Sequence, residues 1–484
     1  ARCHIREEKN KLPFFFFFLT FFSISLNQSE DNLPLLGDPS SASISLSGEY
    51  DLGRLWLSIF RSSVKEYEDP LTTTYIEDLI YRISETSEVR DRRYEFVVID
   101  DESINAFAAP GGIIGINKGM FLKTDFESEF ASVMCHELAH LSQRHFARSQ
   151  SQVTALGNAL LILGSVAVAA ASGSPEGIYL GPALIQQLSI NYTRSNEKEA
   201  DRIGFNNLVR AGFDPKGMSS MFQKLQRSRG ANDEEFSYLM SHPLPKERIT
   251  DARLRENSIE PRGEYRDSLD FYLIKARSIV SSSNNPRDLI KEYEKILLSS
   301  INQKSIVAAE YGLVLSHKKL KNFPSAFKLL RALLDQFPNN LILQTTLMEL
   351  HLEEENNFEA VSVGETLLSL NKSNYAISKI LSKAYLQNNQ ARKAEIILSE
   401  LSRNRPSDPS VWYQLAEAQG LAGNILGLHR SRAEYFMLTG RYDAAIFQLR
   451  EALKLSKNFF EIRESIVSRL EDIFETKKAL RELS

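Results

Sequence analysis

A five-residue stretch of the chain, His-Glu-Leu-Ala-His at residues 136–140, has the residue types and the spacing of a metal-dependent hydrolase site. On a helix, His136 and His140 lie one turn apart on the same face, with Cβ atoms roughly 5–6 Å from each other. Two imidazoles so placed can bind one divalent ion. Glu137 then lies beside that ion, where its carboxylate can take a proton from the water that the metal activates. The pattern therefore favours a metal site over a chance arrangement on a surface helix.

The residues around this stretch predict the helix that carries it. Thr124 and Glu127 have the spacing of a capping box, so we expect the helix to begin there. An apolar stripe roughly opposite the histidines is formed by Phe130, Met134, Leu138 and Leu141. We therefore expect the helix to bury one side and to turn the other side to a cleft. His145 points away from both histidines on the same helix and is not counted as a ligand, and Cys135 is interpreted as a small buried apolar residue.

A second acidic segment supplies a candidate third ligand. Zinc hydrolases use three protein ligands and leave one position for water. Glu197 and Asp201 are four residues apart, so both can face the same site, while Glu199 turns away. We predict that Glu197 binds the metal and that Asp201 accepts the ring N–H of a ligand histidine. An ordinary acidic helix face is the better interpretation of this segment alone, but the histidine pair upstream favours one Zn²⁺ site per chain.

The two motifs at residues 136–140 and 197–201 together resemble the gluzincin metallopeptidases of the HtpX and CAAX-prenyl-protease type. Residues 105–112 resemble the strand-and-turn element that precedes the zinc helix in that family. Residues 241–245, Ser-His-Pro-Leu-Pro, match a His-Pro loop of its soluble bacterial members. The resemblance covers nearly the whole chain, with no departure at the metal-binding positions. It implies a mainly α fold, with an α+β zinc metallopeptidase domain and a C-terminal α-solenoid of tetratricopeptide repeats.

His242 lies in this proline-bounded loop, where the prolines remove backbone donors and stiffen the chain. Considered alone, His242 is best interpreted as a surface histidine. The resemblance implies that the loop lies over the active site. His242 would then occupy the fourth zinc position in a resting form, or donate a hydrogen bond to the oxyanion in a working form.

Two short apolar runs, at residues 96–99 and 113–116, predict strands, and Gly111 and Gly112 predict a turn just before the second. A small sheet beside the zinc helix has a use in proteolysis, because an extended substrate can pair with an edge strand through its main chain. The alternative is that these strands only pack on the helix. We favour an edge-strand substrate site, mostly on the family resemblance.

The N-terminus has the features of a targeting segment. A basic region is followed by an apolar run at residues 12–26, which is shorter than the roughly 20 residues needed to span a bilayer. We therefore predict a cleaved signal peptide at residues 1–28, rather than an anchor, and a periplasmic place of work. A second apolar stretch, at residues 153–171, is broken by glycines and an asparagine. We interpret it as one or two helices packed near the active site, with peripheral contact to lipid or an unfolded client, in preference to a transmembrane helix.

The C-terminal half has the period of tetratricopeptide repeats. Ala326, Ala360 and Ala394 follow one another at intervals of 34 residues, and Pro338 and Pro406 differ by two such periods. An unrelated helical bundle would not produce this spacing. Repeats of this kind stack into a superhelix with a concave face that binds peptides or other proteins.

Length and composition set outer limits on these interpretations. A chain of 484 residues has room for two or more domains, which we predict at residues 48–262 for the metallopeptidase domain and 265–484 for the repeats. The net charge of −4 gives no reason to expect a nucleic-acid or anionic-lipid partner. Two cysteines do not form a disulfide framework.

These observations predict an exported zinc metalloendopeptidase, in which Glu137 takes the proton from water and passes it to the leaving amine. The resemblance implies that its substrates are misfolded or stalled outer-membrane proteins, and that the repeats bind clients or the outer-membrane assembly machinery. The resemblance further implies that the same protein acts as a chaperone. The alternative is a silent scaffold that binds clients through the repeats, but such a scaffold has no need of the intact Glu137 carboxylate.

Overall fold

The fold is mainly helical, with a three-stranded sheet in its N-terminal part, as the sequence predicts. The computed structural model describes residues 44–150, 193–228, 238–260, 265 and 267–483. The predicted signal peptide at residues 1–28 and the apolar stretch at residues 153–171 lie outside these described residues. In the described part of the chain, no helix combines the length and the apolar character that crossing a membrane requires.

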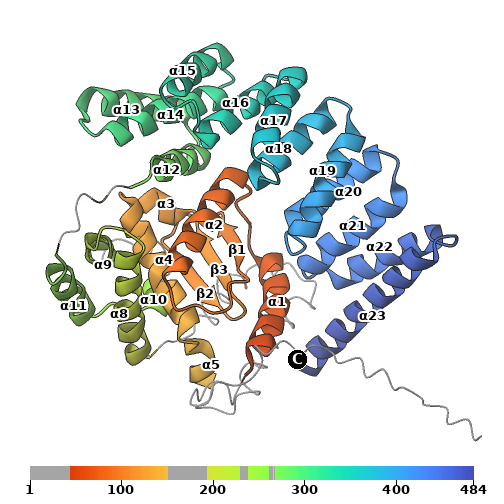
Figure 1. Cartoon of the computed structure of the whole chain (residues 1–484), viewed down its shortest axis with the longest axis horizontal. Coiled ribbons are helices and arrows are strands. Elements are labelled where there is room, and N and C mark those ends of the chain that lie inside the picture. The colour runs from red at the N-terminus through yellow and green to blue at the C-terminus, as the bar shows by residue number, and fades with distance from the viewer. Residues whose placement is uncertain (1–43, 151–192, 229–237, 261–264, 266, 484) are drawn as a thin grey trace, which may run out of the picture.

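We call α1 to α11 the N-terminal part. Its first elements are α1 (Leu46–Ser63), α2 (Pro70–Glu85), β1 (Glu95–Ile99), β2 (Ala106–Ala109), β3 (Ile113–Asn117) and α3 (Gly119–Lys123). They are followed by α4 (Glu127–Ser142), α5 (His145–Gln150), α8 (Arg194–Arg210), α9 (Lys216–Ser228), α10 (Tyr238–Ser241) and α11 (Lys246–Asn257). Figure 1 shows these elements gathered around the sheet, with α4 and α8 side by side.

The sheet has the order β1-β3-β2, with β1 parallel and β2 antiparallel to β3. Both predicted strands are confirmed, and β2 lies in the stretch that carries the family resemblance. Gly111 and Gly112 form the predicted turn at φ of 77° and 76°, a region that favours glycine. Side chains alternate between the two faces. Val97 and Ile113 pack with α1, while Val98 and Ile114 belong to the larger core that contains α2 and α4.

Helix α4 differs from the sequence prediction in two ways. It begins at Glu127 after Phe126, and no side chain caps it, so the predicted capping box is wrong. Thr124 instead donates to the Met120 carbonyl, and the Glu127 carboxylate accepts from the Tyr75 hydroxyl, 2.9 Å away. These hydrogen bonds replace the two that a capping box would make. The predicted cleft-facing side is also wrong, because every residue from 127 to 140 is buried.

The helical repeats run from α12 to α23. They comprise α12 (Leu269–Ser282), α13 (Pro286–Ser299), α14 (Gln303–Lys319), α15 (Phe323–Gln336), α16 (Leu341–Glu353) and α17 (Asn357–Leu370). The remaining helices are α18 (Tyr375–Gln387), α19 (Ala391–Asn404), α20 (Pro409–Leu421), α21 (Ile425–Leu438), α22 (Tyr442–Leu455) and α23 (Phe460–Leu483). The three alanines spaced by 34 residues are fully buried on α15, α17 and α19, which confirms the predicted repeat period.

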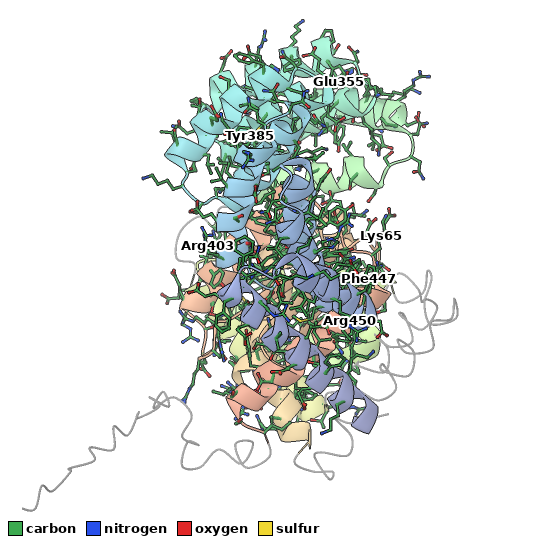
Figure 2. The ribbon with its side chains drawn as sticks, turned by 90° about the vertical axis from the view of Figure 1, so that its right-hand side faces the viewer. Lys65, Glu355, Tyr385, Arg403, Phe447 and Arg450 are labelled. Atoms are coloured by element: carbon green, nitrogen blue, oxygen red, sulfur yellow. The ribbon has the colours of Figure 1, made fainter. Side chains whose placement is uncertain are left out.

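The repeats curve around the N-terminal part (Figure 1). Figure 2 views this arc from the side, with Tyr385 in its upper portion and Phe447 and Arg450 lower down. The first repeat helix, α12, belongs to the same hydrophobic cluster as α2 and α4, and the Phe271 ring centroid lies 6.2 Å from that of Phe130. The domain boundary at residues 262–265 stays a prediction, because one core continues from α4 into α12.

Hydrogen bonds and ion pairs join the repeats to the N-terminal part at several points. Arg277 pairs with Asp69 at 2.7 Å in the interior, and Arg405 donates to Glu77 at 2.6 Å. Farther along the arc, the Tyr442 hydroxyl lies 2.7 Å from the Ser58 hydroxyl on α1. These contacts hold the concave side of the repeats against α1 and α2.

Candidate active site

Four side chains that sequence analysis singled out converge at one point inside the N-terminal part. His136 and His140 come from α4, Glu197 from α8, and His242 follows directly after α10. One nitrogen or oxygen of each lies within 4.8 Å of the others, and all four side chains are buried. The Nε2 atoms of His136 and His140 lie 3.0 Å apart, as their one-turn spacing on a helix leads us to expect.

Glu197 faces both histidines of α4. Its Oε1 lies 3.3 Å from Nε2 of His140, and its Oε2 lies 3.5 Å from Nε2 of His136. Burial opposes ionisation of this carboxyl. The neighbouring His242, together with hydrogen bonds from the α4 histidines, nevertheless holds the pKa of Glu197 well below its usual range. Glu197 is therefore a carboxylate in this site.

Asp201 lies behind His136, on the side away from the convergence point. Its Oδ1 is 3.1 Å from Nδ1 of His136, which matches the expected partner of a ligand histidine. Burial raises the pKa of Asp201, but Arg248 and His136 outweigh burial and lower it. Burial lowers the pKa of His136, and hydrogen bonds to Asp201 and Glu197 more than offset this, raising it to about 9.

Glu137 is anchored by two groups that sequence analysis missed. The Ala108 N–H of β2 donates to Oε2 at 3.1 Å, and the Tyr238 hydroxyl donates to Oε1 at 3.3 Å. Burial is the main cause that raises the pKa of Glu137. A carboxylate with a raised pKa, held by two hydrogen bonds beside the histidines, is suited to act as a general base.

His242 lies inside the site, 1% exposed, so the interpretation of a surface histidine is wrong. Its Nδ1 is 3.0 Å from Oε1 of Glu197, and its Nε2 is 3.5 Å from Oε1 of Glu137. The ring stacks on Tyr238, with centroids 4.5 Å apart. The loop that carries His242 is held in turn by Arg248, which donates to the Pro243 carbonyl at 2.7 Å.

His145 does not point away from the site, in contrast to the sequence prediction. A continuous helix would turn His145 away from both histidines, but α4 ends at Ser142 and Arg144 has a φ of 48°. The chain therefore turns, and Nδ1 of His145 lies 2.9 Å from Nδ1 of His140. His145 Nε2 lies 3.1 Å from Glu199, so Glu199 faces His145 rather than the convergence point.

The group of donors suits a transition metal such as zinc. Two imidazole nitrogens and one carboxylate are a ligand set found in catalytic zinc sites. The two imidazoles are buried and held by partners of their own, Asp201 behind His136 and His145 behind His140. Burial lowers the pKa of His140 well below its ordinary value, so this imidazole is neutral, whereas a metal would bind His136, with its pKa of about 9, in exchange for a proton.

Comparisons with known proteins agree with this geometry. Residues 70–256 match the model of peptidase family M48, and residues 352–418 match a tetratricopeptide repeat model. The β-barrel assembly-enhancing protease of Escherichia coli (strain K12) is 33% identical over 439 residues, which cover 88% of this chain and 87% of that protein. The chain belongs to the β-barrel assembly-enhancing protease family. The family member from Yersinia pestis is 31% identical and covers 88% of both chains.

Family membership makes the chain a metallopeptidase with a C-terminal repeat region, as the motifs predicted. A more distant relative, the mitochondrial metalloendopeptidase OMA1 of Schizosaccharomyces pombe, is 28% identical over 208 residues, which cover 40% of this chain and 58% of that protein.

Sequence reasoning missed Arg248 and Tyr238 because neither lies in the metal motifs. Arg248 is 2% exposed, and its three donor nitrogens contact Asp201, Glu197 and the Pro243 carbonyl. The signal that was available is its position three residues after the Pro-Leu-Pro stretch, in the first turn of a helix. Nothing in the sequence alone indicates which buried carboxylates it pairs with.

Proposed function

We propose that the chain is an exported zinc metalloendopeptidase that acts in the periplasm on misfolded or stalled outer-membrane β-barrel proteins. The observation that carries this proposal is Glu137, a buried carboxylate fixed by Ala108 and Tyr238 beside three groups able to bind a metal. The names of the relatives support the choice of client, because proteins 33% identical to this chain are called β-barrel assembly-enhancing proteases.

His136, His140 and Glu197 would hold the metal, with Asp201 orienting His136. A bound Zn²⁺ supplies a Lewis acid that polarises the scissile carbonyl and lowers the pKa of water at the site to about 7. Glu137 takes the proton from the attacking water and delivers it to the leaving amine. The raised pKa of Glu137 favours both transfers near neutral pH.

His242 is proposed to hold the site in a resting form. Its ring lies 3.0 Å from the Glu197 carboxylate, and both side chains are at most 2% exposed. A substrate carbonyl cannot reach a site covered in this way, so the loop after α10 has to move before cleavage. In the open form His242 would donate a hydrogen bond to the oxyanion.

The β2 strand is the proposed substrate edge. It lies at one side of the sheet, and its Ala108 N–H contacts Glu137 directly. A substrate paired with β2 through its main chain would bring a peptide carbonyl close to Glu137, with little dependence on side-chain sequence. The repeats would bind clients or assembly machinery, and the same surfaces would serve a chaperone activity.

The decisive experiment compares the wild type with Glu137→Gln, which preserves the shape of the side chain but removes the base. Hydrolysis of casein should fall by several orders of magnitude, while metal content and client capture remain. Chelator treatment of the wild type should give the same loss of hydrolysis. Near-normal turnover by the variant would show that another group activates the water.

A further inference from the structure

The sheet has a second edge, β1, on the side opposite the catalytic carboxylate. In the parallel ladder with β3, the main-chain N–H of Glu95 donates to the Gly112 carbonyl at 3.0 Å. The Ile99 carbonyl accepts from the main-chain N–H of Lys118 at 2.9 Å. Residues 95, 97 and 99 therefore direct their main-chain groups to β3. The main-chain groups of Phe96 and Val98 are directed outward, away from the sheet.

The outward groups are paired at only one end of β1. The Val98 carbonyl accepts from the Tyr67 N–H at 2.7 Å, and the Asp100 N–H donates to the Lys65 carbonyl at 2.8 Å. For Phe96, neither the N–H nor the carbonyl has a hydrogen-bond partner among the described residues. Unpaired main-chain groups on an edge strand form a template for another strand.

A cavity of about 1500 Å³ lies along this edge, between the N-terminal part and the concave side of the repeats. We call it the interdomain groove, lined by Tyr81 and Phe96 on one wall and by Tyr413 and Tyr435 on the other. Figure 1 shows β1 at the side of the sheet that faces α19 to α22. The volume exceeds the roughly 300–1,000 Å³ of a small-molecule site, so a polypeptide fits the groove better.

The walls of the groove present aromatic rings. Tyr81 is 46% exposed and its ring centroid lies 6.3 Å from that of Phe96. Across the groove, Tyr413 is 59% exposed and lies 5.4 Å from Tyr435. Exposed tyrosines offer flat contact area with a polar end and lose little conformational entropy on binding.

Charge does not select the occupant, because many charged groups of the groove pair with one another. Arg405 pairs with Glu77, and Arg277 pairs with both Asp69 and Glu349. An occupant recognised here would therefore be held through its main chain and its aromatic side chains rather than through a charge of one sign.

We infer that the interdomain groove binds an extended, unpaired β-strand of another polypeptide, which adds to the sheet at Phe96. The choice of partner rests on the proposed function, since strands of outer-membrane barrels alternate apolar and polar residues and carry aromatic girdles. Across three strands, β1 lies about 10 Å from β2. A client strand bound at β1 is therefore held on the same sheet as the cleavage edge without being presented to Glu137.

The test uses the full chain with Glu137→Gln and a labelled peptide of about ten residues in which tyrosine alternates with threonine. Phe96→Pro removes the outward N–H, a change that an edge strand tolerates at an outward-facing position. Phe96→Leu is the matched control, because it alters the side chain and keeps the N–H. By fluorescence anisotropy, we expect Phe96→Pro to bind the peptide roughly five- to tenfold more weakly than Phe96→Leu.

A second experiment changes the peptide instead of the protein. Two peptides are N-methylated at every second residue, one at the odd and one at the even positions, and their binding is compared with that of the parent peptide. At least one register should lose binding, because methylation removes the N–H groups on the pairing edge. The inference is wrong if a folded Phe96→Pro protein binds as tightly as Phe96→Leu, or if both methylated peptides bind like the parent. It is also wrong if the parent peptide does not bind. Should Phe96→Pro fail to fold, the methylated peptides decide.

Two further measurements separate this inference from its rivals. If deleting residues 1–43 raises peptide affinity more than about tenfold, the chain itself occupies the groove and the inferred partner is wrong. With Glu137 restored, Phe96→Pro should cleave a short unstructured peptide at the wild-type rate. If the wild-type protein does not cleave this short peptide but the full chain still binds the strand peptide, the proposed function is wrong and the inference about the groove still holds.

Discussion

The guanidinium of Arg248 forms a bidentate ion pair with Asp201 inside the protein, with Nε and Nη2 each 2.7 Å from a carboxylate oxygen. The third nitrogen, Nη1, lies 2.6 Å from Glu197. One arginine therefore fixes both the carboxylate proposed to bind the metal and the carboxylate that orients His136. Burial lowers the pKa of Arg248, but the two carboxylates raise it overall, so the group stays charged.

Replacing Arg248 should weaken metal binding without removing a ligand. Arg248→Lys retains the charge but loses the planar fork, and we expect metal affinity to fall roughly 10- to 100-fold. Arg248→Ala also leaves two buried carboxylates unpaired, and should lower the free energy of unfolding by roughly 3–5 kcal/mol. Competition with a chelator and denaturant titration measure these two quantities. Arg253→Lys, an exposed position on the same helix, is the control. Unchanged affinity in Arg248→Lys would show that the ion pair does not tune the site.

The residues at the centre of the site could be predicted from their spacing along single helices. The pairs His136/His140 and Glu197/Asp201 each lie four residues apart, so a helix alone places each pair on one face. The repeat period and both predicted strands could likewise be predicted from sequence patterns alone. The structure brings the two pairs together across α4 and α8, a long-range contact that no local pattern encodes and that only the need of a zinc site for a third ligand, together with the family resemblance, indicated in advance.

The features that sequence analysis missed depend on tertiary contacts. Glu127 has the spacing of a capping residue, but Tyr75 takes its carboxylate across the core. His145 turned toward His140 because the chain leaves the helix near Arg144, at a positive φ that no motif signals. Arg248 meets Asp201 across 47 positions of sequence, which no local pattern encodes.

Loss of His242 should release the proposed resting form. Because the ring lies against Glu197 and covers the site, we expect His242→Ala to raise basal hydrolysis or self-cleavage while the metal stays bound. Casein hydrolysis and elemental analysis on the same sample measure both effects, with His317→Ala in the repeats as the control. Lower activity with metal retained would instead place His242 among the groups that assist catalysis. No change in either quantity would remove it from the mechanism.

Glu349 should make stability depend on pH in the acid range. Burial raises the pKa of Glu349, but Arg277 and Lys318 outweigh burial and lower it to about 2. Because this value lies below the ordinary 4.5, the ionised group stabilises the fold above about pH 4.5, and the stabilisation is lost as pH falls toward 2. Between pH 6 and 3.5, the wild type should lose roughly 1–2 kcal/mol more of its free energy of unfolding than Glu349→Gln, measured by urea titration. The exposed Glu353→Gln should follow the wild type, and parallel curves for all three proteins would contradict the assignment.

Phe271 should be needed for stability of the N-terminal part, although it lies in the first repeat helix. Its ring is fully buried, with centroids 6.4 Å from Phe121 and 6.2 Å from Phe130. Phe271→Ala should lower the free energy of unfolding by roughly 3–5 kcal/mol, because it opens a cavity in the shared core. Phe358→Ala, at a side chain that is 73% exposed, should change it by no more than about 0.5 kcal/mol. Equal effects of the two changes in denaturant titration would show that α12 does not support this core.

The metal content of the purified full chain tests the central claim most directly. Two imidazoles and a carboxylate converge in a buried site, so elemental analysis should find about one zinc per chain. His140→Ala should lose both the zinc and the hydrolysis of casein, while circular dichroism shows that the fold is retained. A well-folded wild-type protein with no transition metal, or a His140→Ala protein that keeps both zinc and hydrolysis, would contradict the assignment of a zinc peptidase site.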